Sequence, residues 1–159
     1  MFESFSPATL AWIHRGALLV HVGGVVVWMG AVAYHLFVLT PAMRIAGLDR
    51  PARYALLRAV KRRIRVVVGI AVAAIVLSGV VNAELRGLWG RGVASANVAR
   101  VFQVKLAVAA LLILIFLTAL PLLKRVKRPR VRGRLFTAVH VAVLALGTVA
   151  AALGVYLAG

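Results

Sequence analysis

The sequence contains no cysteine and only three acidic residues, Glu3, Asp49 and Glu84, among its 159 residues. Without cysteine, the chain cannot be a disulfide-stapled secreted domain or a Cys-ligated zinc or iron–sulfur protein. None of the three acids lies near the middle of an apolar run, so they cannot form a carboxylate proton relay. The sequence also has no glycine-rich phosphate loop and no nucleophile elbow. A conventional ion pump and an ATPase are therefore excluded.

Apolar residues make up 64% of the chain, more than the roughly half expected of a soluble globular protein. This composition excludes a water-soluble enzyme. Four apolar runs suit a hydrocarbon core of about 30 Å: residues 16–39, 66–81, 104–123 and 135–158. With their flanks they predict spans at about residues 9–39, 63–85, 101–123 and 135–158. We therefore expect one all-α domain over residues 1–159, an integral membrane four-helix bundle.

The net charge of +17 is concentrated in two of the three connections between the spans. Their basic residues are Arg44, Arg50, Arg53, Arg58, Lys61, Arg62, Arg63 and Arg65 in the first connection, and Lys124, Arg125, Lys127, Arg128, Arg130, Arg132 and Arg134 in the third. The positive-inside rule places both connections in the cytoplasm and both termini outside. We expect a multi-pass protein of the bacterial inner membrane with periplasmic termini. Its charge meets lipid headgroups, and no nucleic-acid partner is expected.

The first span carries three of the four histidines at seven-residue intervals, His14, His21 and His35, with Trp28 in the remaining position. Seven residues come within about 20° of two full helical turns, so the four side chains share one stripe. Because polar side chains in hydrocarbon are costly, this stripe is expected to face the protein interior.

The fourth histidine, His140, is predicted to lie level with His35. At 1.5 Å per residue, both lie roughly 10 Å to the cytoplasmic side of the membrane centre. Gly147 and Gly154 follow His140 at seven-residue intervals and predict an open face on the last helix. This pattern predicts a b-type haem held by two imidazoles, with propionates near Arg63 and Arg65. The alternative is that both histidines are hydrogen-bonded core residues.

Polar residues also gather near the outer ends of the first three spans. His21 and His14 lie there, at about the same depth as Lys105, Ser78, Asn82 and Glu84. This outer cluster could hold a metal ion, a quinone headgroup or a second cofactor. Histidine and carboxylate suit Cu(II) or zinc, so all four histidines are candidate metal ligands. The alternative for His14 and Lys105 is that they extend to the outer interface.

Local signals predict where helices begin, end and touch. Ser6-Pro7 and Asp49 are typical N-caps, and Thr40-Pro41 predicts the end of the first helix. A basic loop containing Pro129 and Gly133 is expected before the last helix. Small residues at regular spacing predict close helix contacts: Gly16, Gly23 and Gly30, then Gly69 and Ala73, then Gly147, Ala151 and Gly154.

The segment His21-Val-Gly-Gly-Val-Val-Val-Trp28-Met-Gly30, which runs on to Pro41-Ala42, resembles the first helix of CopD-like copper-resistance domains. Leu77-Ser78-Gly79 is similar to that family's Leu-Thr-Gly element, and Val104-Lys105-Leu106-Ala107 to the start of its third helix. The first helix is also similar to that of HemJ-type protoporphyrinogen oxidases, which are associated with b-type haem. The resemblance implies copper or haem handling, with His21 and Lys105 as the transferable positions.

Three functional hypotheses follow. The first is a haem protein that transfers electrons between a membrane quinone and an outer redox partner, with porphyrin oxidation as a variant. The second is copper binding and import through His14 and His21, supplied by an outer copper partner. The third is a subunit without cofactor in a larger membrane complex or homo-oligomer. The sequence does not identify catalytic residues.

Overall fold

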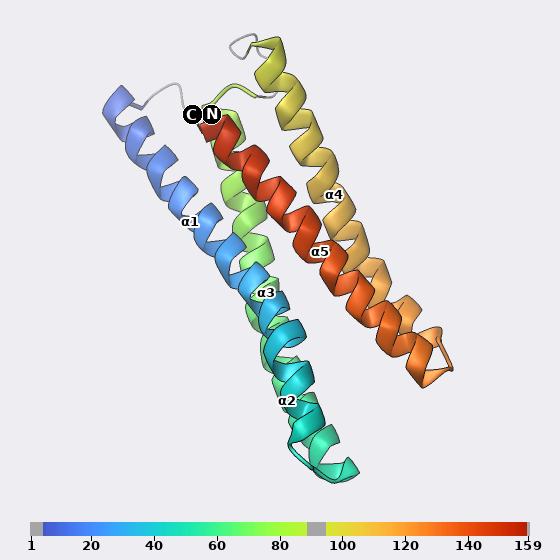
Figure 1. The fold of residues 1–159 in the computed structure, drawn as a ribbon. Helices are drawn as coiled ribbons and strands as arrows, with labels where there is room; N and C mark the ends of the chain where they lie inside the picture. The colour runs from blue at the N-terminus through green and yellow to red at the C-terminus, as the bar shows by residue number, and fades with distance from the viewer. Residues whose placement is uncertain (1–4, 89–94, 159) are drawn as a thin grey trace. The chain divides into compact units, whose positions relative to one another are not determined.

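The computed structural model describes residues 5–88 and 95–158, which are helical apart from short connections (Figure 1). The elements are α1 (Pro7–Ala33), the π-helical segment η1 (Tyr34–Leu39), α2 (Thr40–Ile45), α3 (Arg50–Leu85), α4 (Ala96–Arg125) and α5 (Pro129–Ala158). Four helical stretches are long and apolar enough to cross a membrane: Pro7–Met43, Arg50–Leu85, Ala96–Ala119 and Arg130–Leu157. The predicted all-α class with four membrane-length helices is confirmed.

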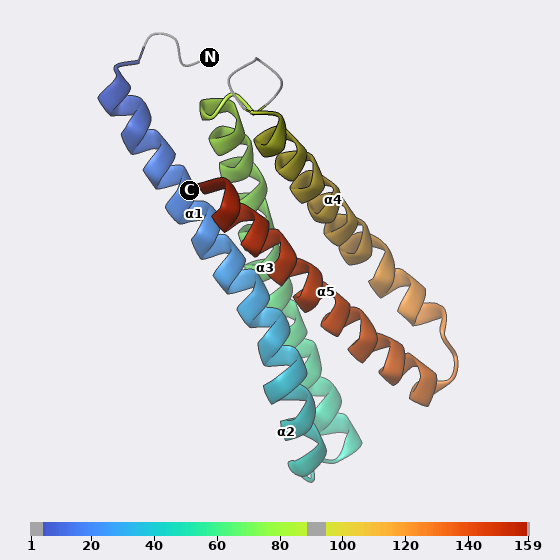
Figure 2. The same ribbon diagram turned by 45° about the horizontal axis from the view of Figure 1, so that its top comes forward.

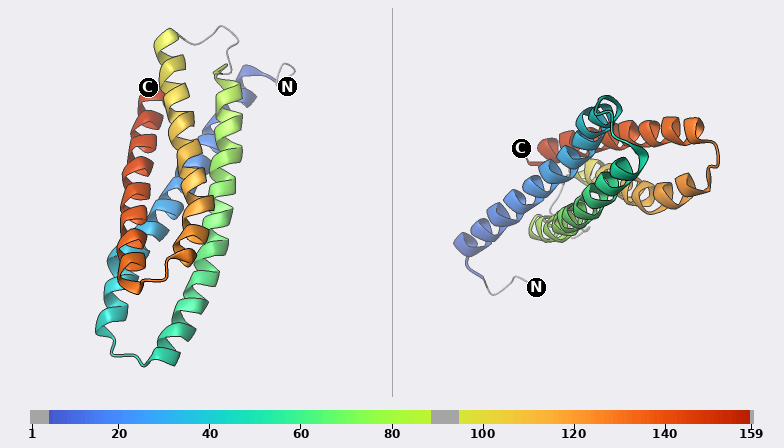
Figure 3. Two further views of the ribbon diagram at one scale, coloured as in Figure 1. Left: turned by 90° about the vertical axis from the view of Figure 1, so that its right-hand side faces the viewer. Right: turned by 90° about the horizontal axis from the view of Figure 1, so that it is seen from below.

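The helices form two antiparallel pairs, each a compact unit. In the first unit, α1, η1 and α2 make one continuous rod that packs along α3 (Figures 1 and 2). Residues 46–49 join the two rods, and Gly47 adopts a φ of 57°, a left-handed conformation that glycine accepts readily. In the second unit, α4 packs along α5 (Figure 3). The predicted basic loop before α5 is shorter than expected, because α5 begins at Pro129 and proline is well tolerated in a first helical turn.

The helix starts predicted from capping residues are confirmed. The Ser6 hydroxyl accepts a hydrogen bond from the Thr9 N–H at 3.2 Å. The Asp49 carboxylate accepts one from the Ala52 N–H at 2.8 Å. Each side chain satisfies a backbone donor that has no partner within the helix. The cap at Asp49 starts α3 well before the apolar run, which leaves a basic helical extension ahead of the membrane span.

The first rod does not end at Thr40-Pro41, so that prediction is wrong. The helix widens into η1 and continues through α2 to Ile45. The Thr40 N–H bonds to the His35 carbonyl, five residues back, and the Thr40 hydroxyl donates to the same oxygen at 2.7 Å. Pro41 has no N–H, and its ring crowds the preceding turn. A wider turn with a threonine hydroxyl satisfies the backbone at lower cost than a helix end in hydrocarbon.

The close contact between α1 and α3 forms at Gly24. This glycine is buried, and a Cβ placed on it would lie 2.8 Å from Ile75 Cγ1 and 3.1 Å from the Ala71 oxygen. The predicted contacts through the other α1 glycines do not form within the first unit, where a Cβ on Gly16, Gly23 or Gly30 meets no described atom within 4 Å. These three glycines follow the histidine stripe by two residues, about 200° around the helix. They therefore point away when the histidines face α3.

The buried side of α3 also differs from the predicted pair Gly69 and Ala73. Ala73 is exposed, and a Cβ on Gly69 meets no described atom within 4 Å. The buried residues of α3 are instead Val68, Ala71, Ser78 and Ala83. Small side chains at Ala71 and Ser78 bring the two helices together, as small residues do in membrane proteins.

Both units present large apolar side chains on their surfaces. Leu19 is 75% exposed on α1, Ile70 67% on α3, Leu117 63% on α4 and Val155 75% on α5. Apolar exposure of this extent along membrane-length helices would be costly in water, but lipid chains solvate it. The chain is therefore a multi-pass membrane protein whose partner is the lipid bilayer.

Gly24→Ala is expected to destabilise the α1–α3 pair by about 1–3 kcal/mol. The added methyl group would press on the Ala71 carbonyl, which belongs to the backbone and cannot rotate away. The measurement is thermal unfolding of the detergent-purified protein. Gly23→Ala is the matched control and should be neutral or stabilising, because alanine is the better helix former. Equal losses in both variants would contradict this packing.

Candidate functional site

The principal polar contact of the first unit joins α1 to α3 at His21. Its ring Nδ1 lies 2.9 Å from the Ile75 carbonyl oxygen and 3.2 Å from the Ser78 hydroxyl. Ser78 is buried, with 6% of its surface exposed, and its hydroxyl donates to the Ala74 carbonyl. Two helices therefore meet at a histidine that is hydrogen-bonded to both the backbone and a side chain of α3.

Glycine at position 79 makes room for this imidazole. A Cβ on Gly79 would lie 3.2 Å from His21 Cε1 and 3.5 Å from His21 Nδ1. The serine and the glycine of the Leu77-Ser78-Gly79 element thus have separate structural roles. Ser78 is hydrogen-bonded to the ring, and Gly79 allows the ring to approach the α3 backbone.

The hydrogen bonds of His21 determine which nitrogen carries the proton. A carbonyl oxygen can only accept, so Nδ1 must donate its hydrogen to Ile75. The Ser78 hydrogen is directed to Ala74, which leaves the serine oxygen as an acceptor toward the same ring. A neutral imidazole with its proton on Nδ1 has its lone pair on Nε2. That is the usual arrangement of a metal-ligating histidine, whose other nitrogen donates to a carbonyl.

His140 on α5 shows the same arrangement within its own helix. Its Nδ1 lies 2.8 Å from the Phe136 carbonyl, and its ring centroid lies 4.0 Å from the Phe136 ring. The carbonyl again requires the proton on Nδ1 and the lone pair on Nε2. Sequence reasoning did not identify Phe136, although its four-residue spacing from His140 places the two rings on one helix face.

His14 lies near the outer end of α1, one heptad before His21. Its Nδ1 is buried and has no hydrogen-bond partner among the described residues, and the same holds for Asn82 Oδ1 on α3. Gly24 contacts Ala71 and Ile75, and His21 contacts residues 75–79. Continuing this antiparallel register brings His14 to the level of Asn82. A water molecule or a cation at this level would satisfy both atoms.

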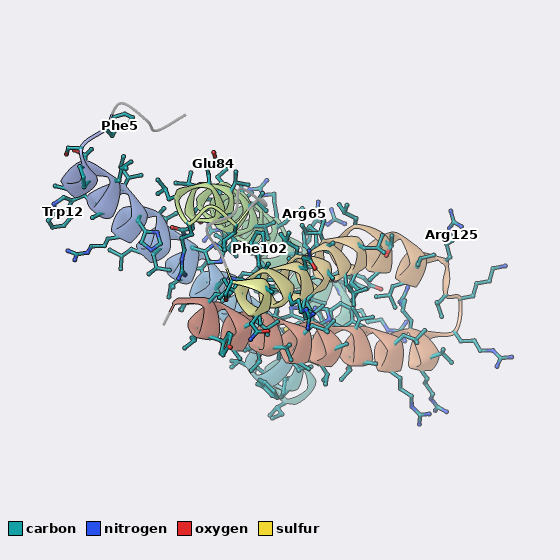
Figure 4. The ribbon with its side chains drawn as sticks, turned by 90° about the horizontal axis from the view of Figure 1, so that it is seen from above. Phe5, Trp12, Arg65, Glu84, Phe102 and Arg125 are labelled. Atoms are coloured by element: carbon teal, nitrogen blue, oxygen red, sulfur yellow. The ribbon has the colours of Figure 1, made fainter. Side chains whose placement is uncertain are left out.

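The sequence-predicted histidines of the first unit lie at separate levels. His14 and His21 are roughly 10 Å apart along one rod, His35 lies roughly 21 Å beyond His21, and His35 is half-buried in η1. Within the described ranges, no three His, Cys, Asp or Glu side chains come together as a metal-binding group. Glu84 is half-buried at the end of α3 (Figure 4).

Lys105 lies in the second unit, against α5. Its Nζ would be 3.1 Å and its Cε 3.7 Å from a Cβ on Gly154. The Lys105 side chain therefore occupies the space next to Gly154. The prediction that the last helix has an open face at Gly154 is wrong. Gly147, the other glycine of that face, is buried. A half-buried lysine in a membrane helix is costly and marks a candidate functional position.

The remaining candidates lie on exposed surface. Arg63 and Arg65 are exposed on α3, immediately before its apolar run. Trp12 is 71% exposed on α1, with the Arg15 guanidinium 5.5 Å from its ring centre. An exposed aromatic beside a cation near a helix end is typical of a membrane interface.

No protein-family model, curated protein or solved structure matches this chain. The likeness to CopD-like and HemJ-type proteins therefore stays a prediction that depends on the residues quoted for it.

Gly79→Ala should displace the His21 ring, because the new methyl group would come within 3.2 Å of Cε1. We expect a changed chemical shift for the His21 ring carbons in an NMR spectrum of the detergent-solubilised protein. Gly69→Ala, on the same helix with no atom within 4 Å of the added Cβ, should leave the signal unchanged. An unmoved signal in Gly79→Ala would show that His21 does not pack there.

Proposed function

We propose that this chain is a haem protein of the bacterial inner membrane, with both termini outside, that transfers electrons between a membrane quinone and an outer redox partner. His35 and His140 are the residues that would hold a b-type haem. When bound, the haem supplies one-electron chemistry at its iron. The excess of basic residues in two connections supports the orientation.

The observation that carries this proposal is the hydrogen bond from His140 Nδ1 to the Phe136 carbonyl, at 2.8 Å. It assigns the lone pair to Nε2, the nitrogen that histidines in proteins commonly offer to iron. The Phe136 ring, whose centroid lies 4.0 Å from that of the imidazole, also limits its rotation. The donor chemistry of His140 therefore fits haem, and a fixed ring loses less conformational entropy when it becomes a ligand.

His35 is the proposed second ligand because its calculated depth matches that of His140. Its carbonyl accepts two hydrogen bonds from Thr40, which fix the widened backbone turn that carries the imidazole. π-helical turns of this kind are frequent at functional sites. Arg63 and Arg65 are exposed at the basic end of the apolar span, a position suited to haem propionates. His21 and Lys105 are proposed for an outer quinone or second redox site.

Copper binding is the second candidate, and the pair of unpartnered atoms favours it. His14 Nδ1 and Asn82 Oδ1 are buried without a hydrogen-bond partner, and nitrogen with oxygen suits Cu(II). His21, one heptad deeper, is the second proposed copper ligand. In this alternative, copper enters from the outer side through His14 and then His21.

The visible spectrum of the detergent-purified protein tests both candidates. We expect a Soret band, with a sharpened α-band on reduction, because two imidazoles make the iron low-spin. His35→Ala and His140→Ala should each lose most of this low-spin spectrum, whereas His14→Ala should keep it as the matched control.

Two results would contradict the haem proposal. The first is a colourless protein that binds copper and loses it in His21→Ala, which would favour copper binding. The second is a colourless protein that binds no copper, which would indicate a subunit without cofactor in a larger complex.

A further inference from the structure

The first 16 residues of α3, residues 50–65, precede its apolar run and form a basic helical extension about 24 Å long. They include seven cationic side chains: Arg50, Arg53, Arg58, Lys61, Arg62, Arg63 and Arg65. No acidic residue lies among them, and the carboxylate of Asp49, just before the helix, caps the Ala52 N–H. The charge of this extension is therefore not compensated by carboxylates of its own segment.

The extension has two different faces. Leu57, Val60 and Ile64 are half-buried and repeat at three and four residues, which is the apolar stripe of an amphipathic helix. The opposite face carries a shallow, open groove between the side chains of this one helix, lined by Pro51, Tyr54, Ala55, Arg58, Ala59 and Arg62. All six of these residues are exposed.

The groove has a regular construction. Arg58 and Arg62 lie one turn apart, so their guanidinium groups can reach the same ligand. Ala55 and Ala59 are small and leave the floor between the long side chains open. Tyr54 is 68% exposed at one end, where its hydroxyl can accept or donate a hydrogen bond.

The membrane-proximal end of the groove lies in the headgroup layer, and its arginine side chains are long enough to extend along the helix toward that layer. Arg62 lies roughly 6 Å and Arg58 roughly 12 Å along the helix before Val66, where the apolar run begins. The polar layer on each side of a bilayer is about 5–8 Å thick, and helix tilt brings Arg58 closer to it. Arginine pairs with phosphate through two parallel hydrogen bonds.

We propose that this groove binds the phosphate of an anionic phospholipid, with Arg58 and Arg62 as the phosphate ligands and Tyr54 as a polar neighbour. Binding at this site differs from non-specific attraction to the basic surface, because it requires the two arginines that share one face of the helix. It is independent of the haem and copper proposals, since none of its residues belongs to those sites.

The test uses the full-length protein in phosphatidylcholine vesicles with a trace of spin-labelled phosphatidylglycerol or spin-labelled phosphatidylcholine. Electron paramagnetic resonance measures the motionally restricted fraction of each lipid. The wild type should prefer phosphatidylglycerol. Arg58→Gln with Arg62→Gln should lower that preference on the order of fivefold, because the phosphate loses both charge-assisted arginine partners.

The matched control is Arg53→Gln with Lys61→Gln, which removes the same charge from exposed positions of this extension outside the groove. This control should keep most of the preference, and the circular dichroism of both double variants should remain helical. Equal losses in both would show diffuse charge attraction and overturn the site. No preference in the wild type would also overturn it. Loss of preference on adding millimolar inorganic phosphate would assign the groove to a free anion instead of a lipid.

Discussion

The structure depends on one constraint: a polar group within the hydrocarbon core must find its partner inside the protein, because no water is available there. The hydrogen bond from His21 Nδ1 to the Ile75 carbonyl meets this constraint between α1 and α3. The bond from His140 to Phe136 meets it within one helix. In both cases the acceptor is a backbone oxygen. The hydrogen bond therefore also decides which ring nitrogen keeps a lone pair.

Close packing in the first unit supports this polar contact. Gly24 lets α1 approach Ala71 and Ile75, and Gly79 lets the His21 ring lie against α3. Ile75 therefore takes part both in the close helix contact and in the hydrogen bond to His21. A substitution that separates the helices would also remove the acceptor that determines the His21 tautomer.

The sequence was sufficient to predict the helical class, the four membrane-length helices and the caps at Ser6 and Asp49, because apolar length and capping chemistry are local properties. It also placed His21 with Ser78, since both lie near the outer ends of their spans. It did not predict that His21 donates to Ile75, because every residue has a backbone carbonyl and the side-chain pattern does not show which one accepts.

Two errors have the same physical origin. Small-residue spacing selected Gly16, Gly23 and Gly30, but only the rotation of α1 about its axis decides which glycine meets a neighbour, and Gly24 does so. Likewise, Gly154 was expected to leave open space, yet the long side chain of Lys105 extends into it. Spacing identifies a helix face without identifying what covers it.

The central claim is that His21 and His140 hold their protons on Nδ1 and present the lone pair on Nε2. The most direct test is nitrogen-15 NMR of the ring nitrogens in metal-free protein labelled at histidine. The account predicts a protonated, pyrrole-type signal for Nδ1 and an unprotonated, pyridine-type signal for Nε2 in both residues. The reverse pattern in either residue, with the proton on Nε2, would contradict it.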